Sequence, residues 1–249
     1  MKTLYYYTPL AILILLWELA SRSGLVSEDV VPSFSATVVE LWRQLFHDDL
    51  LMHVGVSMFR DATGLGSAIV IGIVLGIGMG CSETVRAMFE PIVEATYPLP
   101  KSALIPVLLL WFGIGDMSKI AAIFLGCLLP VVISSFNGAR GVAPQLLWSA
   151  RSLGTGSWRV LWKVILMAAL PEILSGIRIA LALSFVLLIS AELLASSRGL
   201  GYLIGFFGSD GNYAGMFAVI MVVTIIGFAA DVLYRALMRQ SLRWQKQTQ

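Results

Sequence analysis

The chain has 249 residues, of which 58% are apolar and only 13% are charged, and its mean hydropathy is +0.85. A soluble domain of this size does not carry so much apolar sequence. The net charge of +2 offers no basic surface for nucleic acid, and two cysteines with two histidines supply neither a disulfide framework nor a metal-binding motif. The composition therefore predicts an integral membrane protein.

Six apolar stretches approach the length of about 20 residues that a membrane-spanning helix needs. They lie at residues 4–20, 62–81, 91–112, 120–136, 173–195 and 213–235. We therefore predict an all-α integral membrane protein in which residues 1–249 form one transmembrane domain of six helices. Lysine and arginine collect in the segments on the side of the two termini, so we expect both termini in the cytoplasm. The first stretch has no small-residue cleavage site ahead of Glu28, and we expect it to be an anchor rather than a secretory signal.

The segment between the first two predicted spans, residues 21–61, is too polar to cross the membrane and is expected outside it. Apolar residues recur there with helical spacing, at Val38, Leu41, Trp42, Leu45 and Phe46. This pattern predicts an amphipathic helix that begins near Ser33 or Ser35. Such a helix lies either on the outer membrane surface or against another subunit.

The second predicted span carries glycines at every fourth position, Gly72, Gly76 and Gly80, on one helical face. In lipid such a groove lets another helix approach closely, because packing contacts replace the missing hydrophobic drive. The approaching helix belongs either to this chain or to another subunit.

Prolines interrupt the third predicted span, with Pro98 and Pro100 at its start and Pro106 further in, so backbone hydrogen bonds must be lost there. Broken helices at membrane depth are tolerated where they are buried in protein or line an aqueous cavity. Lys101 either reaches the lipid headgroups or faces such a cavity. We assign Pro100, Lys101 and Pro106 to a candidate translocation pathway, together with Glu192, which is either a helix-end anchor or a gate contact.

The loop at residues 137–171 is polar and helix-forming, and it carries four of the 17 lysines and arginines. A first short helix stops at Gly154-Thr155-Gly156, and Ser157 can cap a second. The apolar positions of the two helices are Leu146, Leu147, Ala150 and Leu153, then Trp158, Leu161, Trp162 and Ile165. This helix-elbow-helix either grips a cytoplasmic partner or rests on the inner membrane surface, where anionic lipid would pair with its arginines.

Four sequence segments, in the order in which a known family has them, carry a resemblance to that family. They are Val31 to Ser33, Trp111 to Ile120, Ala169 to Leu181 and Ala191 to Tyr202. With them the chain resembles permease subunits of binding-protein-dependent ABC importers with the type I (MetI-like) fold, in the branch that serves nitrate, sulfonates and taurine. In the family's E-A-A…G signature, Ala150 and Gly154 match, whereas Trp148 and Ser149 depart from it.

The resemblance implies that the loop at 137–171 is a coupling loop whose helices dock into a cytoplasmic ABC ATPase dimer. The residues implied at this contact are Ala150, Arg151, Ser152, Leu153, Gly154, Thr155 and Arg159. It implies no catalytic residue and no cofactor in this chain, because ATP and Mg²⁺ are bound by the partner ATPase; the sequence itself has no phosphate-binding loop. The other implied partners are a second permease copy in a homodimer, an extracytoplasmic solute-binding protein and the lipid of a bacterial inner membrane.

The solute implied by the resemblance is a small anion such as taurine or another sulfonate, nitrate, bicarbonate or a carboxylate. Lys101 would favour an anion by charge attraction if it faces the pathway. Similar sequences serve neutral or cationic vitamin or pyrimidine precursors, and this alternative stays open. An ion-coupled secondary transporter is the alternative from another class, although it would show repeat-related halves.

Overall fold

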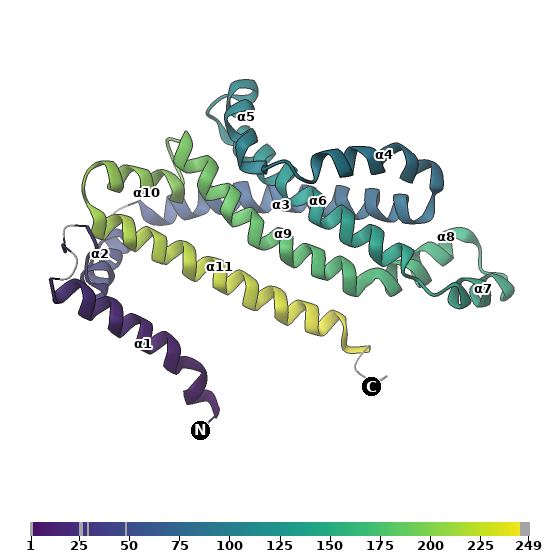
Figure 1. Ribbon diagram of the computed structural model, residues 1–249, viewed down its shortest axis with the longest axis horizontal. Coiled ribbons are helices and arrows are strands. Elements are labelled where there is room, and N and C mark those ends of the chain that lie inside the picture. The colour runs from purple at the N-terminus through teal and green to yellow at the C-terminus, as the bar shows by residue number, and fades with distance from the viewer. Residues whose placement is uncertain (1, 25–26, 29, 48, 245–249) are drawn as a thin grey trace. The chain divides into compact units, whose positions relative to one another are not determined.

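The computed structural model describes residues 2–24, 27–28, 30–47 and 49–244, and every regular element in these ranges is a helix (Figure 1). The α-helices are α1 (Lys2–Arg22), α2 (Phe34–His47), α3 (Leu50–Cys81), α4 (Glu83–Thr96), α5 (Ile105–Phe112), α6 (Asp116–Arg140), α7 (Pro144–Ser152), α8 (Ser157–Val160), α9 (Leu166–Leu194), α10 (Leu200–Ser209) and α11 (Tyr213–Ser241). A 3-10 turn, η1 (Lys101–Leu104), precedes α5, and a π-helical turn, η2 (Leu161–Ile165), joins α8 to α9. The all-α fold class is confirmed.

Four helices in the described part of the chain are long and apolar enough to cross a membrane. They are Leu50–Cys81, Asp116–Arg140, Ser157–Leu194 and Tyr213–Ser241. α4 and Lys101–Phe112 pass the same test together, which makes up to five. α1 covers the first predicted span as one helix of 21 residues, which reach about 30 Å at a rise of 1.5 Å per residue. The exact number of six spans stays a prediction.

Two boundaries of the non-spanning segments differ from the sequence prediction. Residues 50–61 are not part of a polar loop but form the first turns of α3. Their polar side chains, which suggested a loop, are buried, with Ser57 fully buried and Arg60 only 4% exposed. Protein groups hydrogen-bond His53, Ser57 and Arg60 in place of water, and polarity alone cannot reveal that. The loop predicted at 137–171 likewise contracts to 141–156, because the helices on either side continue into it.

The chain divides into two compact units, one made of residues up to Ser57 with Glu192–Ile226, the other of Met58–Ala191 with the residues from Gly227 onward. In the first unit, polar groups join α1 to the start of α2. Glu18 accepts hydrogen bonds from the amide and the hydroxyl of Ser35, at 3.0 and 2.9 Å. Ser33 Oγ accepts from the amide of Ala36 at 3.4 Å. The predicted helix start near Ser33 is therefore confirmed.

The outer face of α2 is apolar and exposed, as its periodicity indicates. Val39, Trp42 and Phe46 are each 60% exposed or more, and the Trp42 and Phe46 rings lie 4.5 Å apart. On the polar side, a hydrogen bond from Arg43 lowers the pKa of Glu40, against the opposing effect of partial burial. The amphipathic character is confirmed, and a membrane surface or another subunit could each cover the apolar face.

In the second unit, the glycine face of α3 packs against α6 (Figure 1). A Cβ atom added at Gly76 would lie 2.5 Å from the carbonyl oxygen of Val132, and one at Gly80 would lie 2.6 Å from Cβ of Ala139. Gly72 meets Val131 in the same way. The helix that uses the predicted groove therefore belongs to this chain.

We expect the substitution Gly76→Ala to lower the melting temperature of the detergent-solubilised protein, with a loss of about 1–3 kcal/mol from overpacking. Gly66→Ala is the matched control, because Gly66 lies on the same helix and an added Cβ there would meet no atom within 4 Å. Equal melting temperatures for the two variants would show that the close approach of α3 and α6 does not matter for stability.

Candidate functional site

The loop between α6 and α9 contains a glycine elbow of defined geometry. α7 ends at Ser152, and Gly154 has φ +74°, in the left-handed region that favours glycine. The amide of Gly154 donates to the carbonyl of Arg151 at 2.9 Å, and the amide of Thr155 donates to that of Ala150 at 3.1 Å. These two bonds form a Schellman motif, which ends one helix and redirects the chain. The predicted elbow is confirmed, and its essential glycine is Gly154.

The second helix of the loop starts differently from the sequence prediction. Its N-cap is Gly156, with φ −65° and ψ 152°, and no side chain caps it; Ser157 is the first helical residue. The prediction that Ser157 caps the helix is therefore wrong, because the extended residue after the elbow is the glycine. Val160 is buried at 3% exposure, and η2 follows it directly. A π-helical turn of this kind is found often at functional sites.

Exposure distinguishes the outward face of this loop. Leu153, at the elbow, is 84% exposed, and Trp148 and Trp158 are 64% and 71% exposed. The candidate contact residues Arg151, Ser152, Gly154 and Arg159 are also exposed, while Ala150 and Thr155 are half-buried. Within the described residues, neither Arg151 nor Arg159 forms an ion pair. The predicted apolar stripes are thus turned partly outward, as on a surface that a partner covers.

The third predicted span is broken between α4 and the segment Lys101–Phe112, whose axes differ by 91°. The break falls at Tyr97 to Pro100, and Pro100 is the N-cap of η1. Pro106 lies in the first turn of α5, where the amide has no helical partner to lose, so it starts a helix instead of breaking one. The predicted break is confirmed, but Pro106 takes no part in it.

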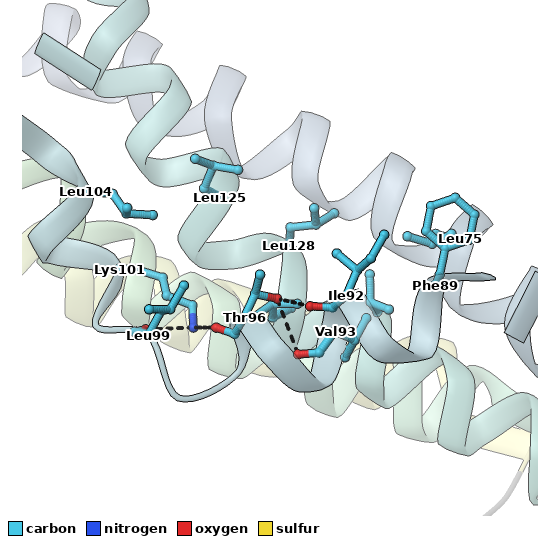
Figure 2. Close-up of a pocket in the computed structure, with 12 residues that line it drawn as sticks. Leu75, Phe89, Ile92, Val93, Thr96, Leu99, Lys101, Leu104, Leu125 and Leu128 are labelled. Carbon is cyan, nitrogen blue, oxygen red and sulfur yellow. Dashed lines mark hydrogen bonds between the residues drawn. The ribbon is translucent and has the colours of Figure 1, made fainter. Parts of the chain in front are cut away.

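Lys101 holds the two sides of this break together (Figure 2). Its Nζ atom donates to the carbonyl oxygens of Thr96, Tyr97 and Leu99, at 2.6, 2.9 and 2.8 Å. The ammonium thereby satisfies carbonyls at the C-terminal end of α4, where helix geometry leaves them unpaired and the helix dipole favours a cation. The sequence did not predict this contact with the chain's own backbone, and whether Lys101 serves the pathway stays a prediction.

Two cavities flank Lys101 in the second unit. One of about 210 Å³ is lined by apolar side chains such as Leu75, Phe89 and Leu128 (Figure 2). The other, of about 500 Å³, lies between the break, α6 and α9, and Tyr97, Ser102 and Ser134 add hydroxyl groups to its wall. Only the larger cavity thus offers several hydrogen-bond donors to a polar solute.

Glu192 belongs to the first unit and is buried at 1% exposure. Its carboxylate accepts from Ser57 Oγ at 2.8 and 2.9 Å and from the amide of Gly201 at 2.9 Å. Ser57 Oγ in turn accepts from the amide of Leu200 at 2.8 Å. The carboxylate thus holds the N-terminus of α10, and its assignment to the pathway stays a prediction.

Sequence reasoning missed the partners of Glu192. The closest approach is at Gly199, which has φ +116° and where an added Cβ would lie 2.3 Å from Glu192 Oε1. The amide of Gly199 donates to His53 Nδ1 at 2.9 Å. The sequence Gly199-Leu200-Gly201 could have indicated a close backbone approach at this point. It does not indicate that the partners are a serine and a histidine some 140 residues earlier. In the described residues there is no group of three or more His, Cys, Asp or Glu side chains that could hold a metal ion.

Comparison with known proteins agrees with this architecture. Residues 68–242 match the family of binding-protein-dependent transport system inner membrane components. The chain is 37% identical over 245 residues to the taurine transport system permease protein TauC of Escherichia coli (strain K12), covering 96% of this chain and 89% of that protein. It is 34% identical over 235 residues to the putative aliphatic sulfonates transport permease protein SsuC of Bacillus subtilis (strain 168), covering 94% and 85%.

The fold is similar to that of a chain in an inward-facing structure of the MetNI methionine ABC transporter. The TM-score is 0.64 at 18% identity, over 77% of this chain and 95% of that one. In such transporters a separate subunit hydrolyses ATP, in agreement with the absence of a phosphate-binding loop from this sequence. The chain therefore belongs to the binding-protein-dependent transport system inner membrane components, as an ABC transporter permease subunit.

Proposed function

We propose that this permease imports taurine, another sulfonate or a related small anion. The observation that carries the proposal is the similarity along almost the whole chain to permeases named for taurine and for aliphatic sulfonates. Nitrate, bicarbonate and carboxylates share the negative charge and remain in the same proposed class. The names of these relatives argue against neutral or cationic vitamin and pyrimidine precursors as the solute. Membership of the ABC permease family excludes the alternative of an ion-coupled secondary transporter.

We infer that the exposed elbow of the 141–156 loop is the surface that couples this permease to its ATPase. A short helix that ends in a hydrogen-bonded turn can transmit rigid-body motion, as a flexible loop could not. Leu153 would fill an apolar pocket on the ATPase, and Arg151 and Arg159 would meet acidic groups there. Ala150, Ser152, Gly154 and Thr155 supply the backbone that keeps Leu153 at the tip.

The complete transporter, in this proposal, has two copies of this permease, two ATPase subunits that bind ATP and Mg²⁺, and an extracytoplasmic solute-binding protein. The permease would lie in a bacterial inner membrane with both termini in the cytoplasm. The loop at 141–156 would then lie on the cytoplasmic side, as coupling to an ATPase requires. A protease site inserted after the last residue should be cleaved only from the cytoplasmic side.

We propose the cavity of about 500 Å³ beside Lys101 as part of the solute pathway. A sulfonate oxygen accepts hydrogen bonds, and Ser102, Ser134 and Tyr97 carry hydroxyls that can donate them. The Lys101 ammonium adds positive charge, although its hydrogen-bond donors are used on backbone carbonyls. Lys101 would therefore attract the solute through its electrostatic field, while the hydroxyl groups would make the direct contacts.

The Lys101→Met variant should lower ATP-driven taurine uptake by more than tenfold in proteoliposomes that contain the complete transporter. The loss has two sources, the missing positive charge and the hydrogen bonds to the carbonyls of Thr96, Tyr97 and Leu99, which hold the two sides of the break together. Lys101→Arg keeps charge and donors and should retain most of the uptake. Ser134→Ala, which leaves the break intact, should raise the KM for taurine. Normal KM and normal uptake in all three variants would exclude this cavity from the pathway.

A further inference from the structure

A cluster of charged side chains lies on the bodies of α9 and α11 in the second unit, outside the coupling loop and the Lys101 break. Arg178 Nε lies 3.0 Å from Asp231 Oδ1, and Arg235 Nε lies 2.8 Å from Asp231 Oδ2. Next to them, Tyr234 Oη donates to the carbonyl of Leu174 at 2.6 Å and joins the two helices. Two guanidinium groups thus share one carboxylate, and a net positive charge remains.

The cluster also has unused hydrogen-bond donors. Each arginine carries five N–H donors in a planar fork. In the described residues, Arg178 donates to Asp231 from Nε, and Arg235 Nε forms an ion pair with Asp231 but no hydrogen bond. The Nη groups of both residues make no hydrogen bond to another described residue. Both side chains are accessible, with 48% and 42% of their surface exposed. Arg239, one turn further along α11, adds a third guanidinium whose Nε donates to the carbonyl of Arg235 at 3.3 Å.

The surface around these arginines is apolar, as expected where a helix faces lipid. Ile179, next to Arg178, and Phe228, on the side of α11 that carries Arg235, are each more than half exposed, and Val232 on the same side is 39% exposed. Both helices belong to segments that are long and apolar enough to cross a membrane. An arginine that faces hydrocarbon without full neutralisation costs several kcal/mol unless it reaches headgroups or water. The cluster is therefore stabilised where it meets lipid headgroups or another anion at the surface of the protein.

Helix lengths place the cluster at the edge of the hydrocarbon layer. At 1.5 Å per residue, Arg178 lies about 24 Å along α9 from its end at Leu194. Asp231 and Arg235 lie about 27 and 33 Å along α11 from its start at Tyr213. The hydrocarbon core is about 30 Å thick. Counted along α11, Asp231 and Arg235 lie at the edge of the hydrocarbon layer, and Arg178 lies about 6 Å inside it when counted along α9.

We propose that Arg178, Arg235 and Arg239 bind the phosphate of an anionic phospholipid, with its acyl chains along Phe228 and Val232 on the same side of α11. A phosphodiester brings a negative charge to this positive excess, and its oxygens fit the paired Nη donors of an arginine. Asp231 orients two of the forks without neutralising the cluster. The lipid stabilises the contact between α9 and α11 at the membrane edge, whatever solute the transporter carries.

Arg86 on α4 has the opposite ratio of arginines to carboxylates and provides the matched control for the lipid-binding test. One guanidinium there faces two carboxylates, at 2.6 Å from Glu83 and 3.7 Å from Glu90, and leaves no positive excess. Loss of this arginine should not change lipid binding. Arg235→Gln and Arg239→Gln are the test variants, because Asp231 keeps Arg178 as its partner in both.

The test uses the complete transporter, delipidated in mild detergent and titrated with phosphatidylglycerol or phosphatidylcholine while native mass spectrometry counts the bound lipids. Arg235→Gln and Arg239→Gln should each weaken phosphatidylglycerol binding about fivefold, the factor that corresponds to about 1 kcal/mol per arginine near anionic lipid. Arg86→Gln and every phosphatidylcholine titration should show no change. Asp231→Asn, which raises the positive charge, should keep or strengthen phosphatidylglycerol binding.

Equal phosphatidylglycerol affinity in wild type and both test variants would overturn the proposal. The proposal would also be overturned if millimolar inorganic phosphate displaced the lipid and, without lipid, stabilised the protein against heat to the same extent. That result would show a site for a soluble anion. Loss of the second permease copy or of the ATPase from Arg235→Gln, with lipid binding unchanged, would assign the cluster to a protein contact. None of these outcomes depends on whether taurine is the solute.

Discussion

Replacement of Gly154 by proline is expected to abolish solute-stimulated ATP hydrolysis and uptake in the reconstituted transporter. Gly154 has φ +74°, whereas a proline ring holds φ near −65°. The substitution also removes the amide that donates to the carbonyl of Arg151. The Schellman turn cannot form, at a cost of about 3 kcal/mol or more, and Leu153 loses its fixed position at the tip. Uptake should fall by more than tenfold, while the spanning helices stay folded.

Gly156→Pro is the matched control, two residues further along the same loop. Gly156 has φ −65°, which proline adopts without strain, and it precedes the first turn of α8, where proline is tolerated. This variant should keep most of the coupled ATPase activity. If Gly154→Pro couples as well as Gly156→Pro, the elbow is not the lever through which the ATPase acts.

The Glu192→Ala variant is expected to lower the melting temperature of the permease and to loosen α10. The carboxylate accepts hydrogen bonds from Ser57 and from the amide of Gly201, and hydrogen bonds to a charged group contribute about 1.5–3 kcal/mol each. Alanine leaves these buried donors without a partner. We expect a loss of stability of about 3 kcal/mol, measured as thermal unfolding in detergent, and faster amide exchange at Gly201 and Leu200.

Glu94→Ala serves as the control for this loss, because Glu94 is an exposed carboxylate on α4 and makes no hydrogen bond to another described residue. Its melting temperature should equal that of the wild type. The melting temperature of Glu192→Gln should lie between those of Glu192→Ala and Glu94→Ala, since the amide oxygen accepts hydrogen bonds but carries no charge. Unchanged exchange at Gly201 in Glu192→Ala would show that the carboxylate does not hold the start of α10.

Patterns that depend on neighbouring residues along the chain were predictable. The elbow at Gly154 and the start of α2 at Ser33 follow from local rules for helix ends. The break near Pro100 follows from the missing amide and the restricted φ of proline. By contrast, Ser157 was misassigned because serine fits both the last position outside a helix and the first position inside it. The effect of Pro106 on the helix was misassigned because proline can either interrupt a helix or start one.

Side-chain partners across the chain could not be predicted. Lys101 donates to carbonyls at the end of the preceding helix, a contact that the sequence did not predict. Glu192 meets Ser57, and Arg178 meets Asp231, over separations of 135 and 53 residues. No periodicity encodes such a meeting, since it depends on which faces of two helices pack together.

The sequence by itself determined the membrane class, the helical fold, the glycine face of α3 and the elbow of the loop. Each of these is a consequence of hydrophobicity or of backbone geometry, which the residues carry wherever they lie. Only the tertiary structure decided that α6 occupies the glycine face and that residues 50–61 are helix, because these outcomes depend on burial. It also decided where the scarce charges point. In an apolar chain each charge must find a partner, and packing in three dimensions selects which one.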